Sequence, residues 1–193
     1  MKLIFATHNQ NKVIEIAPLI PQHFEIVSLH DIGFLEDIPE TAFTLEGNAV
    51  LKAETIFKAT GLNCFADDTG LEVEALNGAP GVFSARYAGE QKNAQVNINK
   101  LLHELQEEQN RKARFRTVIC LILEGEKYMF EGIVEGKIET VRAGSGGFGY
   151  DPIFTPKGYQ QTFAQMTLEE KSKISHRGIA FDQLIRFLNE YKS

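Results

Sequence analysis

The chain has 193 residues, and 43% of them are hydrophobic, which is ordinary for a folded globular protein and too high for a disordered one. The formal net charge of −6 argues against nucleic acid as a partner. No apolar stretch approaches the roughly 18 residues that a membrane span needs, so we expect no membrane partner either. The length suits one domain, and we expect residues 1–193 to form a single domain with two lobes.

The first third of the chain indicates alternating strands and helices. Residues 2–6 form an apolar run typical of a strand, a polar loop follows, and apolar residues recur at helical spacing over residues 12–20. Residues 25–29 indicate a second strand. Thr44 is a suitable N-cap for a helix that we expect to end near Gly61.

The rest of the chain mixes hairpins with helices. In order, the pattern predicts a buried strand at residues 63–66, an alternating strand at 71–75, a rigid loop at 78–81, a helix at 93–109 and antiparallel strands at 115–123 and 127–141. Residues 144–147 are too rich in glycine for regular structure. Thr167 begins a capping-box sequence, and Ser175 can cap the last helix. We therefore expect a mixed α/β sheet with helices and two lobes flanking a central cleft.

The two cysteines, Cys64 and Cys120, lie in apolar segments with no Cys-x-x-Cys or histidine-rich spacing beside them. We expect reduced core thiols, with neither a disulfide nor a structural zinc site. The apolar run at residues 1–6 is too short for the core of a signal peptide and leads directly into a polar segment. A cytoplasmic location is therefore expected.

Two adjacent carboxylates, Asp67 and Asp68, come at the end of an apolar run, and Thr69 and Gly70 follow directly. Concentrated negative charge where a buried strand reaches the surface is costly unless a metal or a reaction uses it. The oxygens of these side chains suit Mg²⁺, and Gly70 would let the backbone turn sharply. Adjacent strand residues point to opposite faces, so only one carboxylate is expected at a reacting centre. A plain turn or an Asp cap is the alternative interpretation.

A polar loop lies where the first predicted strand leads into the first predicted helix. Unpaired N–H groups at a helix start favour phosphate, and Lys12 adds a positive charge. A polar turn with an N-cap explains the same residues without a ligand, so both interpretations stay open for this loop alone. The candidate phosphate-binding residues are Thr7, His8, Asn9, Gln10, Asn11 and Lys12.

The last quarter of the chain carries candidates for binding a base. Phe148 stands between glycines, and a base stacked on it could gain about 1–3 kcal/mol. Asp151 could accept a hydrogen bond from a base N–H. Lys171, His176 and Arg177 supply positive charge and planar donors at a second helix start. A core-facing phenylalanine and a structural histidine are the alternative interpretations.

Several motifs stand in order along the chain: Thr7-x-Asn9-x-x-Lys12, Ala66-Asp67-Asp68-Thr69-Gly70-Leu71-x-Val73, Gly78-Ala79-Pro80-Gly81 with Ser84-Ala85-Arg86-Tyr87, Phe148-Gly149-Tyr150-Asp151-Pro152-Ile153-Phe154, and Ser175-His176-Arg177-Gly178. Together, over about residues 2 to 190, they resemble the inosine triphosphate pyrophosphatase family. The resemblance implies Mg²⁺-dependent hydrolysis of ITP, dITP and XTP to the monophosphate and pyrophosphate, which cleanses the nucleotide pool. It also implies a homodimer and an elongated mixed α/β fold with a nucleotide cleft.

The resemblance further implies roles for individual residues. Asp68 takes the catalytic acidic position, and Glu40 and Asp68 hold the metal. The implied substrate-binding residues are Thr7, His8, Asn9, Gln10, Asn11, Lys12, Thr69, Phe148, Gly149, Tyr150, Asp151, Lys171, His176 and Arg177. Three positions depart from the common pattern: Thr69 stands where serine is usual, Gln165 where glutamate is common and Ser172 where asparagine is common. The last two bear on details of the site rather than on the reaction class.

A mechanism follows as a hypothesis. Asp68 orients or deprotonates a water that attacks the α-phosphorus, while Lys12, Lys171 and Mg²⁺ stabilise the displaced charge. Donors from His176 or Arg177 and from backbone N–H groups would donate to the six-keto group of hypoxanthine or xanthine and would reject the six-amino group of adenine. Guanine shares the keto group, so its rejection must involve the two position.

Two other functions stay open at this point. One is a pyrophosphatase of the septum-inhibitor type that acts on modified pyrimidine or methylated nucleotides, and the residues 148–151 and the Ser-His-Arg motif argue against it. The other is a non-catalytic nucleotide-binding module. Intact Glu40, Asp68, Lys12 and Lys171 argue against that module.

Overall fold

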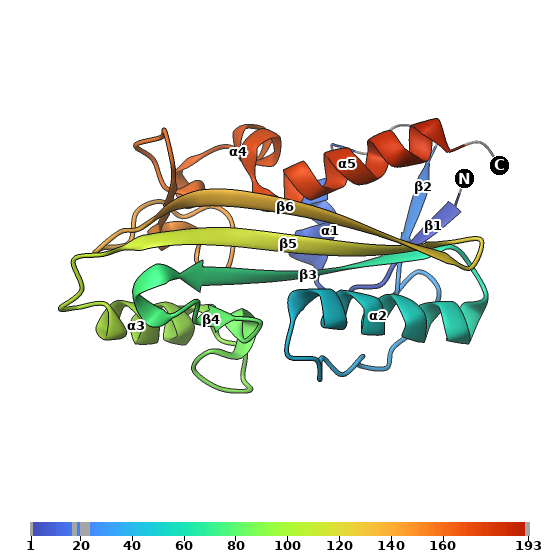
Figure 1. The fold of residues 1–193 in the computed structure, drawn as a ribbon, viewed down its shortest axis with the longest axis horizontal. Coiled ribbons are helices and arrows are strands. Elements are labelled where there is room, and N and C mark those ends of the chain that lie inside the picture. Colours follow the sequence, from blue (N-terminus) through green and yellow to red (C-terminus); the bar gives the residue numbers. More distant parts are fainter. Residues whose placement is uncertain (1, 17–18, 20–23, 192–193) are drawn as a thin grey trace. The chain divides into compact units, whose positions relative to one another are not determined.

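The computed structural model, drawn as a ribbon in Figure 1, describes residues 2–16, 19 and 24–191. The chain divides into two compact units. Unit 1 comprises Met1–Asp68, Thr117–Gly132 and Arg177–Ser193, and unit 2 comprises Thr69–Arg116 and Ile133–His176. No helix in the described ranges combines the length and apolar character that crossing a bilayer requires. That residues 1–193 act as a single domain stays a prediction.

The helices and strands alternate in the first part of the chain and are followed by long hairpin strands. In chain order they are β1 (Lys2–Phe5), α1 (Gln10–Ile16), β2 (Glu25–Ser28), α2 (Leu45–Thr60), β3 (Cys64–Val73), β4 (Pro80–Gly81), α3 (Ala94–Glu104), β5 (Lys112–Leu123), β6 (Glu126–Ile138), β7 (Phe154–Pro156), α4 (Leu168–Ile174) and α5 (His176–Glu190). The sheet order is β2-β1-β3-β5-β6-β7, with β4 paired to β3, and the long strands lie side by side in Figure 1.

The sheet is mixed. Strand β1 pairs in parallel with β2 and β3, whereas β4 is antiparallel to β3 and β7 is antiparallel to β6. Parallel neighbours need crossover connections, and α1 and α2 supply helical ones here. The expected mixed α/β fold is therefore confirmed.

Local chemistry sets several element ends as expected. The Thr44 side chain accepts a hydrogen bond from the Gly47 N–H, and Gly61 ends α2 in the left-handed conformation with φ of 66°. Thr167 and Glu170 form the expected capping box at the start of α4. Gly144, Gly146 and their neighbours lie outside regular structure, as expected.

The expectation that a strand ends near Ala66 and another begins at Leu71 is wrong. Strand β3 is continuous from Cys64 to Val73, so Asp67, Asp68 and Gly70 lie within it and no sharp turn occurs there. Both aspartates are buried rather than emerging at the surface. The strand tolerates them because other elements bring cations to each carboxylate, and a periodicity argument does not see those cations.

Other boundaries differ by a few residues. The helix expected at residues 93–109 ends at Glu104, because the chain then turns to place the Arg111 guanidinium on the carbonyl oxygens of Leu105, Ile138 and Glu139. The strand expected at 127–141 correspondingly ends at Ile138. The first helix begins at Gln10 rather than at Lys12, and most of its expected last turn falls outside the described residues.

Each unit has its own aromatic core. In unit 1 the rings of Phe5 and Phe65 stack with centroids 4.6 Å apart, and Phe181 from α5 meets Phe65 edge-on. In unit 2 Phe115 contacts Phe154 edge-on with centroids 4.7 Å apart. These rings bury the inner faces of β1, β3, β5 and β7 and hold the strands that carry the candidate site.

The two thiols give a first testable prediction. Cys64 and Cys120 are free and have no exposed surface, and burial raises the pKa of Cys64 to about 12 and that of Cys120 to about 11. We expect neither to react with a chromogenic disulfide reagent at about pH 8.5, where an ordinary thiol is half ionised. Both should react after unfolding in urea. Rapid labelling of one thiol in the folded protein would contradict this.

Candidate functional site

The loop before α1 is held by its own polar side chains. The Asn9 side-chain oxygen accepts from the Asn11 N–H at 3.0 Å, and the Thr7 hydroxyl accepts from the Asn9 N–H at 3.1 Å. The His8 ring lies 3.0 Å from the carbonyl oxygen of Glu36. The loop therefore has the capped turn that one interpretation expected, and its binding of phosphate stays a prediction.

Lys12 and Asp67 begin a buried chain of charges in unit 1. The Lys12 ammonium lies 2.8 Å from Oδ1 of Asp67, and Nε of Arg177 lies 3.5 Å from Oδ2 of the same carboxylate. The guanidinium of Arg177 also contacts the carboxylate of Glu15. We call these four residues the Asp67 network. Its side chains are between 0% and 14% exposed, so two acids and two bases balance one another away from water.

The charges of the Asp67 network reinforce one another. Burial alone would raise the pKa of Asp67, but Lys12 and Arg177 outweigh it and hold that pKa well below its usual range. Burial lowers the pKa of Lys12, and Asp67 opposes this shift. Asp67 is thus an ionised partner of two cations.

Asp68 has a different set of partners, which come from α2 and the loop before it. Asn48 Nδ2 donates to Oδ2 of Asp68 at 3.0 Å, and the Lys52 ammonium lies 3.4 Å from Oδ1. The same ammonium donates to Oε1 of Glu40 at 2.6 Å. Burial raises the pKa of Asp68, and Lys52 opposes the shift. Burial would lower the pKa of Lys52, but Asp68 and Glu40 outweigh it and raise that pKa.

The two neighbouring aspartates therefore face different surroundings, as expected for successive residues of one strand. Asp67 contacts Lys12 and Arg177, whereas Asp68 shares Lys52 with Glu40. The structure brings together Glu40 and Asp68, the two predicted metal ligands, around one ammonium group. Only Asp68 of the aspartate pair joins this group.

The donor set of Glu40 and Asp68 fits Mg²⁺. Both offer hard carboxylate oxygens, which already contact a cation, Lys52. Within the described residues no group of three or more His, Cys, Asp or Glu side chains is arranged to hold a metal. Mg²⁺ is commonly bound by one or two carboxylates together with substrate phosphates, so two carboxylates are sufficient.

Unit 2 holds a second predicted group around Asp151. Its carboxylate accepts from the Phe148 N–H at 2.7 Å and from the Lys171 ammonium at 2.7 Å. That ammonium also lies 5.0 Å from the centroid of the Phe148 ring. The side chains of Asp151 and Lys171 are only 3% and 4% exposed. Asp151 thus holds the backbone of Phe148 and the Lys171 ammonium beside its ring. Contact of Asp151 with a base stays a prediction.

Gly147 beside this group gives a second prediction. Gly147 has φ of 68°, and an added Cβ would collide with the Asp151 carboxylate, whereas Gly158 has φ of 88° and nothing within 4 Å of that position. We expect Gly158→Ala to cost about 1–2 kcal/mol from left-handed strain alone. Gly147→Ala should cost about 1–3 kcal/mol more, because it also overpacks the site. Urea unfolding measures both, and equal losses would contradict the contact.

Two further predicted residues of unit 2, Tyr150 and His176, are buried, whereas Thr69 and Gly149 are partly exposed. His176 is 3% exposed and stacks on Phe115 with ring centroids 4.5 Å apart. The Tyr150 hydroxyl donates to the carbonyl oxygen of Ser84 at 2.9 Å. Thr69 is partly exposed on β3. Binding of substrate by these four residues stays a prediction.

The sequence reasoning missed Glu15, Asn48 and Lys52. Asn48 and Lys52 are four residues apart and lie on the buried face of α2 with Ala49 and Ala53. Polar residues at helical spacing within an apolar stripe are a signal that could have identified them. Glu15 gives no comparable signal, because its partner Arg177 is 162 residues away.

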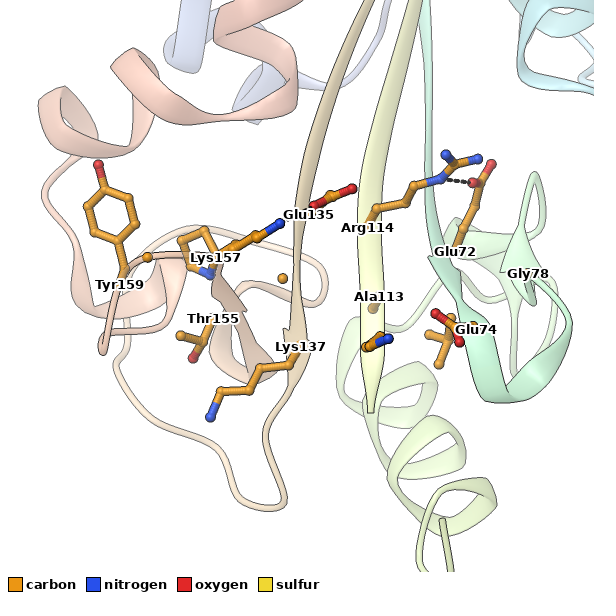
Figure 2. Close-up of a pocket in the computed structure, with 15 residues that line it drawn as sticks. Glu72, Glu74, Gly78, Ala113, Arg114, Glu135, Lys137, Thr155, Lys157 and Tyr159 are labelled. Atoms are coloured by element: carbon orange, nitrogen blue, oxygen red, sulfur yellow. Dashed lines mark hydrogen bonds and ion pairs between the residues drawn. The ribbon is translucent and has the colours of Figure 1, made fainter. Parts of the chain in front are cut away.

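A cavity of about 770 Å³ lies elsewhere in unit 2 (Figure 2). Strands β3, β5, β6 and β7 line it, and Arg114 Nε donates to the Glu72 carboxylate at 2.6 Å there. Positively charged lysines and negatively charged glutamates surround this pair. The cavity contains none of the predicted site residues.

The fold and the site define a mixed α/β protein with a magnesium-compatible pair of carboxylates, of which Asp68 is buried and Glu40 is partly exposed. The chain belongs to the Ham1 family, whose model matches residues 3–187. The family resemblance drawn from the motifs is thereby confirmed.

Individual proteins match over nearly the whole chain. A relative from Flavobacterium psychrophilum, named dITP/XTP pyrophosphatase, is 58% identical and covers 97% of this chain and 98% of its own. The solved structure of the Staphylococcus aureus Ham1 protein is 40% identical, with a TM-score of 0.90 and full coverage of both chains. That of a HAM1 protein from Coxiella burnetii is 36% identical, with a TM-score of 0.90, 99% coverage of this chain and 100% of its own.

Proposed function

We propose that this chain hydrolyses dITP, ITP and XTP to the nucleoside monophosphate and pyrophosphate in the presence of Mg²⁺. Full-length relatives that are 58% and 56% identical to it are named dITP/XTP pyrophosphatase, and the chain is an enzyme of that nucleoside triphosphate pyrophosphatase class. The observation that supports the proposal is the pairing of Glu40 and Asp68 around Lys52, because two carboxylates that lie together suit a metal and a proton acceptor.

The residues of unit 1 support a division of roles. Glu40 and Asp68 would hold Mg²⁺, which when bound supplies positive charge to the triphosphate. Asp68 accepts a proton from the attacking water, which is the part of a general base. Lys12 and Lys52 are fixed cations that stabilise negative charge on the leaving pyrophosphate.

Substrate recognition extends the proposal. The residues 7–12 bind phosphate, and Thr69, which is partly exposed, lies beside Asp68 in sequence and contacts a phosphate oxygen. In unit 2, Phe148 stacks on the base, with Gly149 and Tyr150 shaping its loop and Asp151 and Lys171 holding it. His176 and Arg177 favour a six-keto group. The active protein is a homodimer in the cytoplasm.

The test is pyrophosphate release from ITP, dITP, XTP, GTP, ATP and a modified pyrimidine nucleotide at saturating Mg²⁺. We expect release from the first three to be at least about 100-fold faster than from ATP, because buried donors that face an amino group reject it strongly. A fluorescent or coupled pyrophosphate assay measures these rates. Equal rates on all purines would contradict the base selectivity. Preference for modified pyrimidines would support a pyrophosphatase of the septum-inhibitor type. Binding of the nucleotide without release of pyrophosphate would support a non-catalytic nucleotide-binding module.

A further inference from the structure

We propose that Asn48 is a positioning residue that fixes the carboxylate of Asp68 and ties it to the segment that carries Glu40. The inference rests on the proposed function, because it assigns Asn48 a role through Asp68. Asn48 lies within unit 1 on α2, has no exposed surface and takes no part in capping the helix. A buried amide on the apolar face of a helix needs a compensating role.

Both ends of the Asn48 amide are used. Its Nδ2 donates to Oδ2 of Asp68 at 3.0 Å, and its Oδ1 accepts from the backbone N–H of Ala42 at 2.9 Å. The partners fix the orientation of the amide, since a carboxylate only accepts and a backbone N–H only donates. The side chain is therefore a rigid bridge from β3 to the loop two residues beyond Glu40.

Only an amide of this length satisfies both partners. An aspartate at this position would place a second carboxylate against Asp68, and a leucine of similar size would leave the bridge without a donor or an acceptor. Sequence alone does not reveal this requirement, because Asn48 and Asp68 are 20 residues apart.

The surroundings make the bridge stiff. A Cβ on Gly47 would lie 2.6 Å from Cβ of Ala42, so the loop packs directly on the first turn of α2. One turn after Asn48, Lys52 contacts Glu40 at 2.6 Å and Asp68 at 3.4 Å. Helix α2 thus holds one oxygen of Asp68 through Asn48 and the other through Lys52, and this fixes the plane of the carboxylate.

Asn48→Leu tests the proposal through kinetics and stability together. For ITP hydrolysis we expect kcat to fall about 10- to 100-fold while KM changes less than about threefold, because a misplaced catalytic group lowers the rate rather than the affinity. The same substitution in an Asp68→Asn background should change the residual kcat less than about twofold. If Asn48 acted independently of Asp68, Asn48→Leu would lower kcat by the same factor in the Asp68→Asn background as in the wild type.

Asn97→Leu is the matched control. Asn97 is also a buried helical asparagine, and it bonds to the Ala88 N–H at 2.7 Å and the Ala85 carbonyl at 2.9 Å, without contacting Asp68 or Glu40. We expect it to lower the midpoint of urea unfolding as Asn48→Leu does, but to change kcat less than about threefold. An equal loss of kcat in both variants would overturn the positioning role.

Unfolding supplies a readout that needs no activity. In a double-mutant cycle of Asn48→Leu and Asp68→Ala, the unfolding constant of the double variant should be about tenfold smaller than the product of the single effects predicts. If the two losses in the free energy of unfolding simply added, the contact between Asn48 and Asp68 would be refuted, even if the enzyme were active. If the wild type released no pyrophosphate from any nucleotide, the proposed function would fail, whereas the cycle would still decide whether Asn48 positions Asp68.

Discussion

Asp68→Asn is expected to lower kcat for pyrophosphate release from ITP by about 10³-fold, within the range that general bases contribute. The amide keeps the size of the side chain and can still accept from Lys52, whose ammonium lies 3.4 Å from Asp68 in the wild type. It cannot take a proton from water at neutral pH, and it removes one of two carboxylates that suit Mg²⁺. Initial rates at saturating ITP and Mg²⁺ measure the loss.

Asp31→Asn is a suitable control for the loss of a carboxylate. Asp31 lies in unit 1, accepts from the Ser28 N–H at 2.8 Å and is exposed to solvent. This variant should keep wild-type kcat, and circular dichroism should show that both variants are folded. If Asp68→Asn kept more than about a tenth of the wild-type kcat, another group would have to be the proton acceptor.

Arg177→Met is expected to destabilise the protein by about 3–5 kcal/mol, because it leaves buried negative charge without its cation. In the wild type the guanidinium lies between the carboxylates of Glu15 and Asp67, and its side chain is only 2% exposed. Two acids would then share the single ammonium of Lys12. The free energy of unfolding in urea measures the loss.

Two further variants give this prediction its contrast. Arg186→Met lies on the same helix but removes an exposed pair with Asp182, so it should cost at most about 1 kcal/mol. Glu15→Leu combined with Arg177→Met removes one acid and one base together and should recover part of the stability lost by Arg177→Met alone. If Arg177→Met alone lowered the free energy of unfolding as little as Arg186→Met does, the Asp67 network would not stabilise the fold.

Local chemistry made part of the fold predictable. Thr44 caps α2 and Thr167 caps α4 through hydrogen bonds that reach only three residues along the chain. Because both partners of such a hydrogen bond lie within a few residues, the residue types alone reveal it. The start of α2, its end at Gly61 and the capping box therefore needed no tertiary information.

The choice of Asp68 over Asp67 was only half contained in the sequence. The alternation of a strand separates the two side chains, but it does not say which side meets Glu40. The answer comes from Lys52, which α2 places between Glu40 and Asp68, while Lys12 and Arg177 contact Asp67. The strand was expected to end near Ala66 for the same reason, because the sequence does not show the cations that neutralise Asp67 and Asp68 inside β3.

The sequence by itself determined the family and the mixed α/β class, because those are properties of residue type and order. The tertiary structure alone decided which charges neutralise one another. Glu15 and Arg177 are 162 residues apart, and Asn48 and Asp68 are 20 apart. Electrostatic energy depends on distance in space and on exclusion of water, and both are set only when the elements pack.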